Sequence, residues 1–135
     1  MTGPLLARLT SRFEDAVART REALAENGFG VLMEIRIAAA LKEELGVDLE
    51  DYLIFGACNP ELAYQAIRVD REIGLLLPCN VVVRAEPDNP ATVIVEAMDP
   101  SILVEVTGEP ALVAIAGEVK EKLSAAIASL AVVHS

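Results

Sequence analysis

The chain has few of the residues on which common nucleic-acid and catalytic sites depend. Its 135 residues include no tryptophan, two tyrosines, three phenylalanines, two cysteines and a single histidine. So few aromatic rings supply no stacking platform for single-stranded nucleic acid. The formal net charge of -10 repels phosphate backbones and anionic lipid surfaces. We therefore expect no nucleic-acid partner.

Long apolar runs and targeting segments are also missing. Charged residues, proline or glycine interrupt every apolar run before the roughly 18 residues that a membrane-spanning helix needs. The segment Met1 to Leu9 lacks the apolar stretch of a secretory signal. These absences predict a cytoplasmic protein with no membrane partner. In a reducing compartment its two cysteines are expected to be free thiols.

Familiar catalytic and cofactor motifs do not occur either. The sequence has no Gly-x-Gly-x-x-Gly string, no Gly-Lys-Ser/Thr string and no Gly-x-Ser-x-Gly elbow. The single histidine, His134, lies in the tail and gives no Ser-His or Cys-His pair. Cys58 and Cys79 are 21 residues apart, which matches neither a Cys-x-x-Cys redox motif nor the paired spacing of a zinc site. We expect no metal site, and the sequence indicates no particular cofactor.

What the chain does have is a hydrophobic content of 53%, which suits residues 1–135 to one domain with one core. Period-two and helical patterns predict a series of strands and helices. The strands are expected at 5–9, 29–37, 52–57, 79–85 and 91–98, and the helices at 12–26, 38–45, 60–69 and 110–130. A Ser11-x-x-Glu14 capping box is expected to start the first helix. The order of elements predicts the α+β class, with a mixed, mostly antiparallel sheet of about five strands and helices packed on it.

Two Cys-Asn dipeptides mark the ends of predicted strands. Cys58-Asn59-Pro60 joins a strand to a helix, since Asn is a good N-cap and Pro is favoured at the first helical position. Cys79-Asn80 begins the next strand. If the sheet brings these ends together, the two thiols share one pocket. The positive end of the helix would then lower the pKa of Cys58 and make it nucleophilic, redox-active or metal-binding. The alternative is that both are packed core cysteines.

Three further residues have both a functional and a structural interpretation. Asn59 and Asp99 each precede a proline, so they either cap their own helices or present two helix N-termini to a carboxylate or phosphate ligand. Tyr64 lies about one helical turn beyond Cys58-Asn59, where it either contacts a ligand or fills the core with its hydroxyl at the edge.

Six short segments together carry a resemblance to a known family. They are Gly28-Phe29-Gly30-Val31-Leu32, Leu45-Gly46-Val47-Asp48, Gly56-Ala57-Cys58-Asn59-Pro60, Ala63-Tyr64, Gly74-Leu75-Leu76-Leu77-Pro78-Cys79-Asn80-Val81 and Ala97-Met98-Asp99-Pro100. With these segments the sequence resembles the bacterial and archaeal family called domain of unknown function 302. The resemblance covers nearly the whole chain from the first helix to the last, and it implies a compact α+β fold and a homodimer without any established reaction. The residues that match the family's pattern favour a shared pocket, and they are Cys58, Asn59, Pro60, Tyr64, Pro78, Cys79, Asn80 and Asp99.

Three hypotheses for the function follow. The first is a domain without demonstrated catalysis that binds a small molecule or an anion near the two Cys-Asn segments. The second is a thiol-based redox or sulfur-transfer protein that uses Cys58 and Cys79, and the third is a structural dimerisation module. The candidate ligand-binding residues are Cys58, Asn59, Pro60, Tyr64, Cys79, Asn80 and Asp99.

Overall fold

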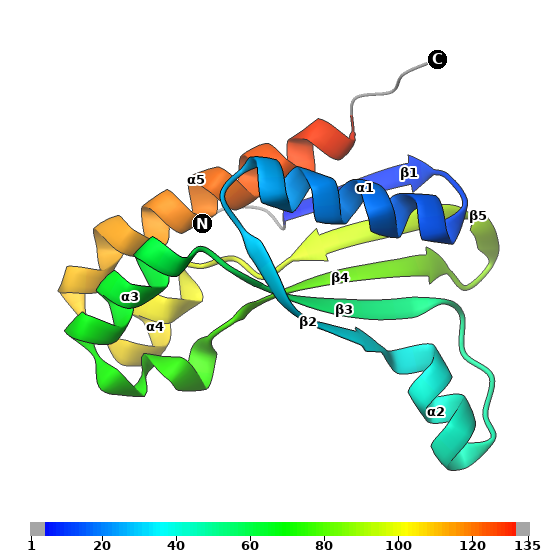
Figure 1. The fold of residues 1–135 in the computed structure, drawn as a ribbon, viewed down its shortest axis with the longest axis horizontal. Helices are drawn as coiled ribbons and strands as arrows, with labels where there is room; N and C mark the ends of the chain where they lie inside the picture. The colour runs from blue at the N-terminus through cyan, green and yellow to red at the C-terminus, as the bar shows by residue number, and fades with distance from the viewer. Residues whose placement is uncertain (1–4, 132–135) are drawn as a thin grey trace.

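A five-stranded antiparallel sheet forms the centre of the protein, whose computed structural model describes residues 5–131 (Figure 1). The strands lie in the order β1-β5-β4-β3-β2, and all four pairings are antiparallel. The predicted α+β class is therefore confirmed, and the sheet is antiparallel throughout rather than mixed. The strands are β1 (Leu5–Thr10), β2 (Gly30–Arg36), β3 (Tyr52–Cys58), β4 (Cys79–Glu86) and β5 (Asn89–Ala97).

Two long helices cover one face of the sheet, and the other helices lie at its ends (Figure 1). The helices α1 and α5 pack side by side on the covered face, α3 and α4 gather beyond one end of the sheet, and α2 projects away from the opposite end. The helices are α1 (Phe13–Glu26), α2 (Ile37–Leu45), α3 (Pro60–Val69), α4 (Ile102–Thr107) and α5 (Val113–Leu130), with 3₁₀ turns η1 (Arg71–Leu76) and η2 (Pro110–Leu112). Within residues 5–131, every helix is too short or too polar to cross a membrane.

Alternate side chains of the strands form the core beneath α1 and α5. Successive residues of a strand point to opposite faces, and on β3 Leu53, Phe55 and Ala57 are all fully buried on the covered face. The helix predicted at 110–130 is confirmed as η2 and α5, and α5 packs on β1 and β5. The buried residues of this segment recur at helical spacing and are Leu112, Ala116, Val119, Leu123, Ile127 and Leu130.

The edge strand β2 departs from its predicted alternation. The pairing register with β3 shifts between Val31 and Met33, as in a β-bulge. The one extra residue moves each later side chain of β2 to the face opposite to the predicted one. Val31 packs against the core, but Met33 and Ile35 are 44% and 41% exposed. Glu34 instead pairs with Arg21 of α1, whose guanidinium lies 5.0 Å from the centre of the Phe55 ring.

The start of α1 also differs from the prediction, whereas its end agrees. The predicted capping box is wrong, because Arg12 is the N-cap residue without a side-chain cap and Ser11 donates to the Arg12 carbonyl at 2.8 Å. The Glu14 carboxylate accepts two hydrogen bonds from Arg36, at 2.9 and 3.0 Å, and this pairing lowers the pKa of Glu14. An ion pair to β2 has replaced the local cap. At the other end, Gly28 has a φ of +89°, which favours glycine and stops the helix where predicted.

Two glycines give matched tests of packing. A Cβ at buried Gly56 of β3 would lie 2.9 Å from Cγ of Pro78 and 3.0 Å from Cε of Met33. The proline ring cannot swing aside as a flexible side chain can, so we expect Gly56→Ala to lower the free energy of unfolding by about 1–3 kcal/mol. Gly117→Ala, in an open part of α5, is expected to raise it by about 0.5–1 kcal/mol. Urea denaturation of both variants measures these changes, and a Gly56→Ala protein as stable as the wild type would contradict the packing.

Candidate functional site

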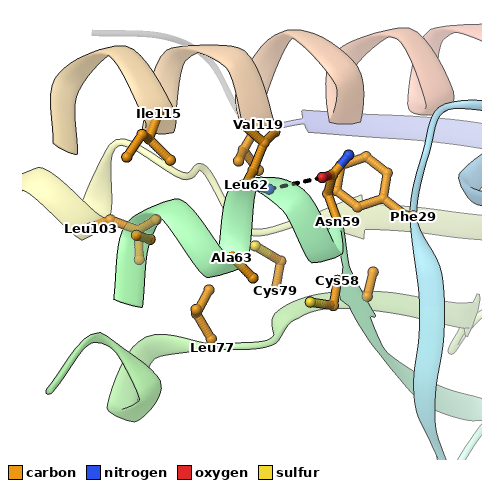
Figure 2. A pocket seen from close by; sticks show the side chains of 12 residues that line it. Phe29, Cys58, Asn59, Leu62, Ala63, Leu77, Cys79, Leu103, Ile115 and Val119 are labelled. Carbon is orange, nitrogen blue, oxygen red and sulfur yellow. Dashed lines mark hydrogen bonds between the residues drawn. The ribbon is translucent and has the colours of Figure 1, made fainter. Parts of the chain in front are cut away.

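The two Cys-Asn segments meet at one end of the sheet. The antiparallel register pairs Ala57 with Cys79, so Cys58 at the end of β3 and Cys79 at the start of β4 lie on neighbouring strands. Directly after β3 the chain passes through Asn59 into α3, which begins at Pro60. Both cysteines are free thiols, and both line one pocket beside α3 (Figure 2).

The pocket is small and almost entirely apolar. Its cavity has a volume of about 20 Å³, and Asn59 supplies the only amide or charged side chain of its wall. A buried water needs roughly 10–15 Å³ together with two to four polar partners, and a wall of this kind does not supply them. The cavity therefore suits a guest of about one atom that is weakly hydrated. The lining residues are Phe29, Ala57, Cys58, Asn59, Leu62, Ala63, Ala66, Leu77, Cys79, Leu103, Ile115 and Val119.

Asn59 at the rim of the pocket is a helix cap. Its Oδ1 accepts a hydrogen bond from the Leu62 amide at 3.0 Å, and Pro60 follows at the first position of the helix, where it is exposed. A Cβ at Gly28 would lie 3.0 Å from Nδ2 of Asn59, so the other side of the amide faces the backbone that follows α1. The side chain thus caps α3 and lies close to the backbone at Gly28, beside the pocket.

Cys58 does not have the lowered pKa that its position before a helix predicts. Burial in the pocket raises its pKa instead. Burial also raises the pKa of Cys79 to about 11, and the charge of neighbouring Cys58 adds to that shift. The expectation of an activated Cys58 thiolate is therefore wrong, because removal from water disfavours the charged form of a thiol.

Two of the other candidate residues point away from the pocket. Cys79 and Asn80 are adjacent in β4, so their side chains lie on opposite faces, and Asn80 is exposed whereas Cys79 is buried. Tyr64 is 61% exposed on α3, where the Arg68 guanidinium lies 5.8 Å from the centre of its ring. The Tyr64 ring thus packs against a neighbour on its own helix and does not fill the core.

Asp99 lies outside the pocket, in the turn before α4. One carboxylate oxygen accepts the Ser101 amide at 2.9 Å, and the other is 3.1 Å from Nζ of Lys120 on α5. Asn59 therefore caps its own helix, as its structural interpretation predicts. For Asp99 that interpretation is wrong, because the N-cap residue of α4 is Ser101 and the Asp99 carboxylate accepts its amide in the turn before the helix. Of the seven candidate residues, the pocket brings together Cys58, Asn59 and Cys79.

The apolar wall of the pocket is the part that sequence reasoning missed. Leu62 and Ala66 carried a usable signal, because their spacing places them on one apolar face of the helix predicted at 60–69. Leu103 belongs to α4, whose start the Asp99-Pro100 pair indicated but whose extent the sequence pattern did not predict. Ile115 lies in α5 beside the buried residue Ala116. These residues come from distant parts of the chain, and no local pattern indicates that they surround the two cysteines.

Comparisons with known proteins agree with this fold. The family model described as domain of unknown function DUF302 matches residues 7–130. The chain is similar to the crystal structure of an uncharacterised conserved DUF302 protein from Bacillus stearothermophilus, with a TM-score of 0.82. The two are 28% identical, and the match covers 91% of this chain and 94% of that chain. Among curated proteins, none matches the chain.

The raised pKa of Cys79 predicts a stability that falls in alkaline solution. Unfolded cysteine has a pKa of about 8.5, so between about pH 8.5 and 11 the folded chain keeps a proton that the unfolded chain has lost. The contribution is complete below the unfolded pKa and is lost as the pH rises through the folded pKa. We expect a loss of at most about 2–3 kcal/mol in the free energy of unfolding across this range.

Urea denaturation across this pH range, on the wild type and on Cys79→Ala, checks the prediction. All other titrating groups are common to both proteins, so the difference between the two pH profiles isolates Cys79. The variant is expected to lose stability less steeply than the wild type between about pH 8.5 and 11. Parallel profiles would show that Cys79 ionises as readily in the folded chain as in the unfolded one.

Proposed function

The chain belongs to the family described as domain of unknown function DUF302, and we propose that it is a small-ligand binding domain. The family description states no activity, so the proposal rests on the pocket. The binding site is the pocket between Cys58, Cys79 and α3. One observation carries the proposal: two thiols that are 21 residues apart in the sequence line a single apolar cavity. The ligand is small and weakly hydrated, because the cavity is about 20 Å³ and its wall has little to offer a polar group.

The lining residues favour a neutral or soft ligand over an anion. No lysine, arginine or histidine is among the described residues that line the pocket, so an anion would be buried without a counter-charge. The Asn59 oxygen is already bonded to α3. The small-molecule form of the binding hypothesis is therefore better supported than its anion-binding form.

The acidity of the thiols also favours binding over thiol chemistry. A thiol with a pKa of about 11 is ionised in roughly one molecule in 10,000 at pH 7, and the thiolate is the nucleophile. Thiol-disulfide exchange and attack on a sulfur donor would both be slow from such a group. We therefore place redox and sulfur transfer by Cys58 and Cys79 behind binding.

Xenon tests whether the pocket admits a small apolar guest. Dry apolar cavities bind xenon, and xenon needs neither a thiolate nor a charge. Under xenon pressure, we expect saturable shifts of the backbone amide resonances of Cys58, Ala63 and Cys79 in the wild type. Ala63→Leu is expected to abolish the shifts, because Ala63 lines the pocket and a larger side chain fills it.

Ala114→Leu is the matched control, since Ala114 is an exposed helix residue on α5 that does not line the pocket. This variant is expected to keep the xenon response of the wild type. Amide resonances around the pocket that do not respond to xenon in the wild type would refute the proposed binding site.

A second function, association with another copy of the chain, is supported by an arm of the fold, helix α2, which projects away from the end of the sheet (Figure 1). Helix α2 has no buried residue, and a helix of nine residues is marginal in water without packing. Large exposed apolar side chains cluster in and around β2 and α2: Leu32, Met33, Ile35, Leu45, Val47 and Leu49. An edge strand beside an apolar arm makes a surface that two copies can share by pairing about a two-fold axis. We infer a homodimer through this surface.

A charge placed on α2 tests the inferred dimer. Leu45 and Leu75 are 68% and 86% exposed, and Leu75 lies in η1, at the end of the sheet opposite to α2. We expect the wild type to sediment as a dimer at micromolar concentration and Leu45→Lys to shift it towards monomer, because a lysine is costly to bury in an apolar interface. Leu75→Lys is expected to sediment like the wild type. A monomeric wild type would remove the basis of this inference.

A further inference from the structure

Cys58 and Cys79 offer two soft donor atoms to one small cavity. Both sulfur atoms are directed towards the space beside Ala63 and Leu77 (Figure 2). None of the other residues that line the cavity carries a carboxylate or an imidazole. We propose that the two thiols bind one soft monovalent metal ion, Cu(I), as a two-coordinate dithiolate. This inference rests on the proposed function and names the ligand of the same site.

The number and type of donor atoms select the ion. Within residues 5–131 there is no group of three or more His, Cys, Asp or Glu side chains placed to hold a metal ion. Zinc takes four such ligands in structural sites and three in catalytic sites, and Ca²⁺ and Mg²⁺ take oxygen. Cu(I) prefers thiolates, and as a soft ion of single charge it is satisfied by two of them in a linear arrangement. The cysteine spacing that argues against zinc therefore does not argue against an ion that needs only two ligands.

The surroundings of the thiols suit a dehydrated ion. The cavity of about 20 Å³, which both cysteines line, has room for one ion but not for its hydration shell. Leu62 and Leu77 help to shield the site from water, and such an apolar shell controls the access of solvent to a bound metal. A hard, strongly hydrated ion would lose its water here without gaining oxygen ligands.

Charges and protons balance without a redox partner. Two S–H bonds break, two Cu–S bonds form, both protons pass to solvent and copper remains Cu(I). The occupied site carries one net negative charge, and the positive end of α3, two residues after Cys58, offsets part of it. Burial that disfavours a free thiolate is compatible with this site, because the bound ion neutralises half of the charge that the two lost protons leave.

Competition with a chromophoric Cu(I) chelator, under anaerobic conditions and with reduced full-length protein, tests the proposal. We expect the wild type to withdraw one Cu(I) per chain from the chelator. Loss of a residue that only supports a metal ligand weakens metal binding by roughly 10–100-fold. Cys58→Ser and Cys79→Ser each remove a direct ligand, so each is expected to weaken Cu(I) binding by at least about 100-fold. Met33→Leu removes a sulfur atom that does not line the cavity and is expected to bind like the wild type.

Circular dichroism establishes that each variant is folded, and Cys79→Ala replaces Cys79→Ser if a buried hydroxyl prevents folding. Binding that persists in either single cysteine variant, or that is equally weak in the wild type and the double variant, would overturn the Cu(I) site. Xenon distinguishes a wrong Cu(I) site from a wrong binding pocket, because xenon binding does not require the thiols to ionise. A pocket that admits xenon but not Cu(I) would leave the proposed binding function standing and the metal refuted.

Discussion

Burial of one face of the sheet beneath α1 and α5 is the interaction on which the rest of the structure depends. Leu53, Phe55 and Ala57 of β3 are fully buried there, and Leu123 of α5 is buried with them in the same core. The burial of apolar surface is the dominant favourable term in folding, and here most of it lies on this face. With that face fixed, alternation determines where the strand residues point, except at the bulge of β2. Beyond Val31 the edge strand β2 lies outside this core, and so does α2.

The thiol pocket is the end of that core, at the point where α3 covers the sheet. Ala57 and Val119 line both the pocket and the core, so the chemistry of the thiols follows from apolar packing. Burial raises the pKa of Cys58 although the thiol lies just before a helix N-terminus, a position where thiol pKa values are often lowered. The apolar wall therefore disfavours a thiolate at this position, which is why we propose the binding of soft or apolar groups there and not thiol chemistry.

Much of the fold follows from local sequence patterns, and the parts that do not are set by contacts between distant residues. The last helix, the hairpin of β4 and β5 and the Asn59 cap depend on periodicity and cap chemistry within a few residues, and all were predictable. The β2 bulge depends on how that strand registers against β3. The predicted Ser11 cap does not form, and Glu14 instead pairs with Arg36, which is 22 residues away in the sequence. Part of the candidate site was predictable, because alternation within β4 already places Cys79 and Asn80 on opposite faces. The raised pKa values of the thiols were not, because they depend on apolar neighbours from α3, α4 and α5.

The same alternation lets one strand serve two surfaces. Ala57 of β3 faces the pocket, whereas the preceding residue, Gly56, faces Met33 and Pro78 on the opposite side, where the exposed apolar residues of β2 begin. Because Gly56 has no side chain, the Pro78 ring and the Met33 side chain both lie close to β3 on the face opposite to the pocket. The residues that line the pocket and the exposed apolar residues of β2 therefore share no side chain. The proposed ligand binding and the inferred self-association thus use different residues, and substitutions can test each one separately.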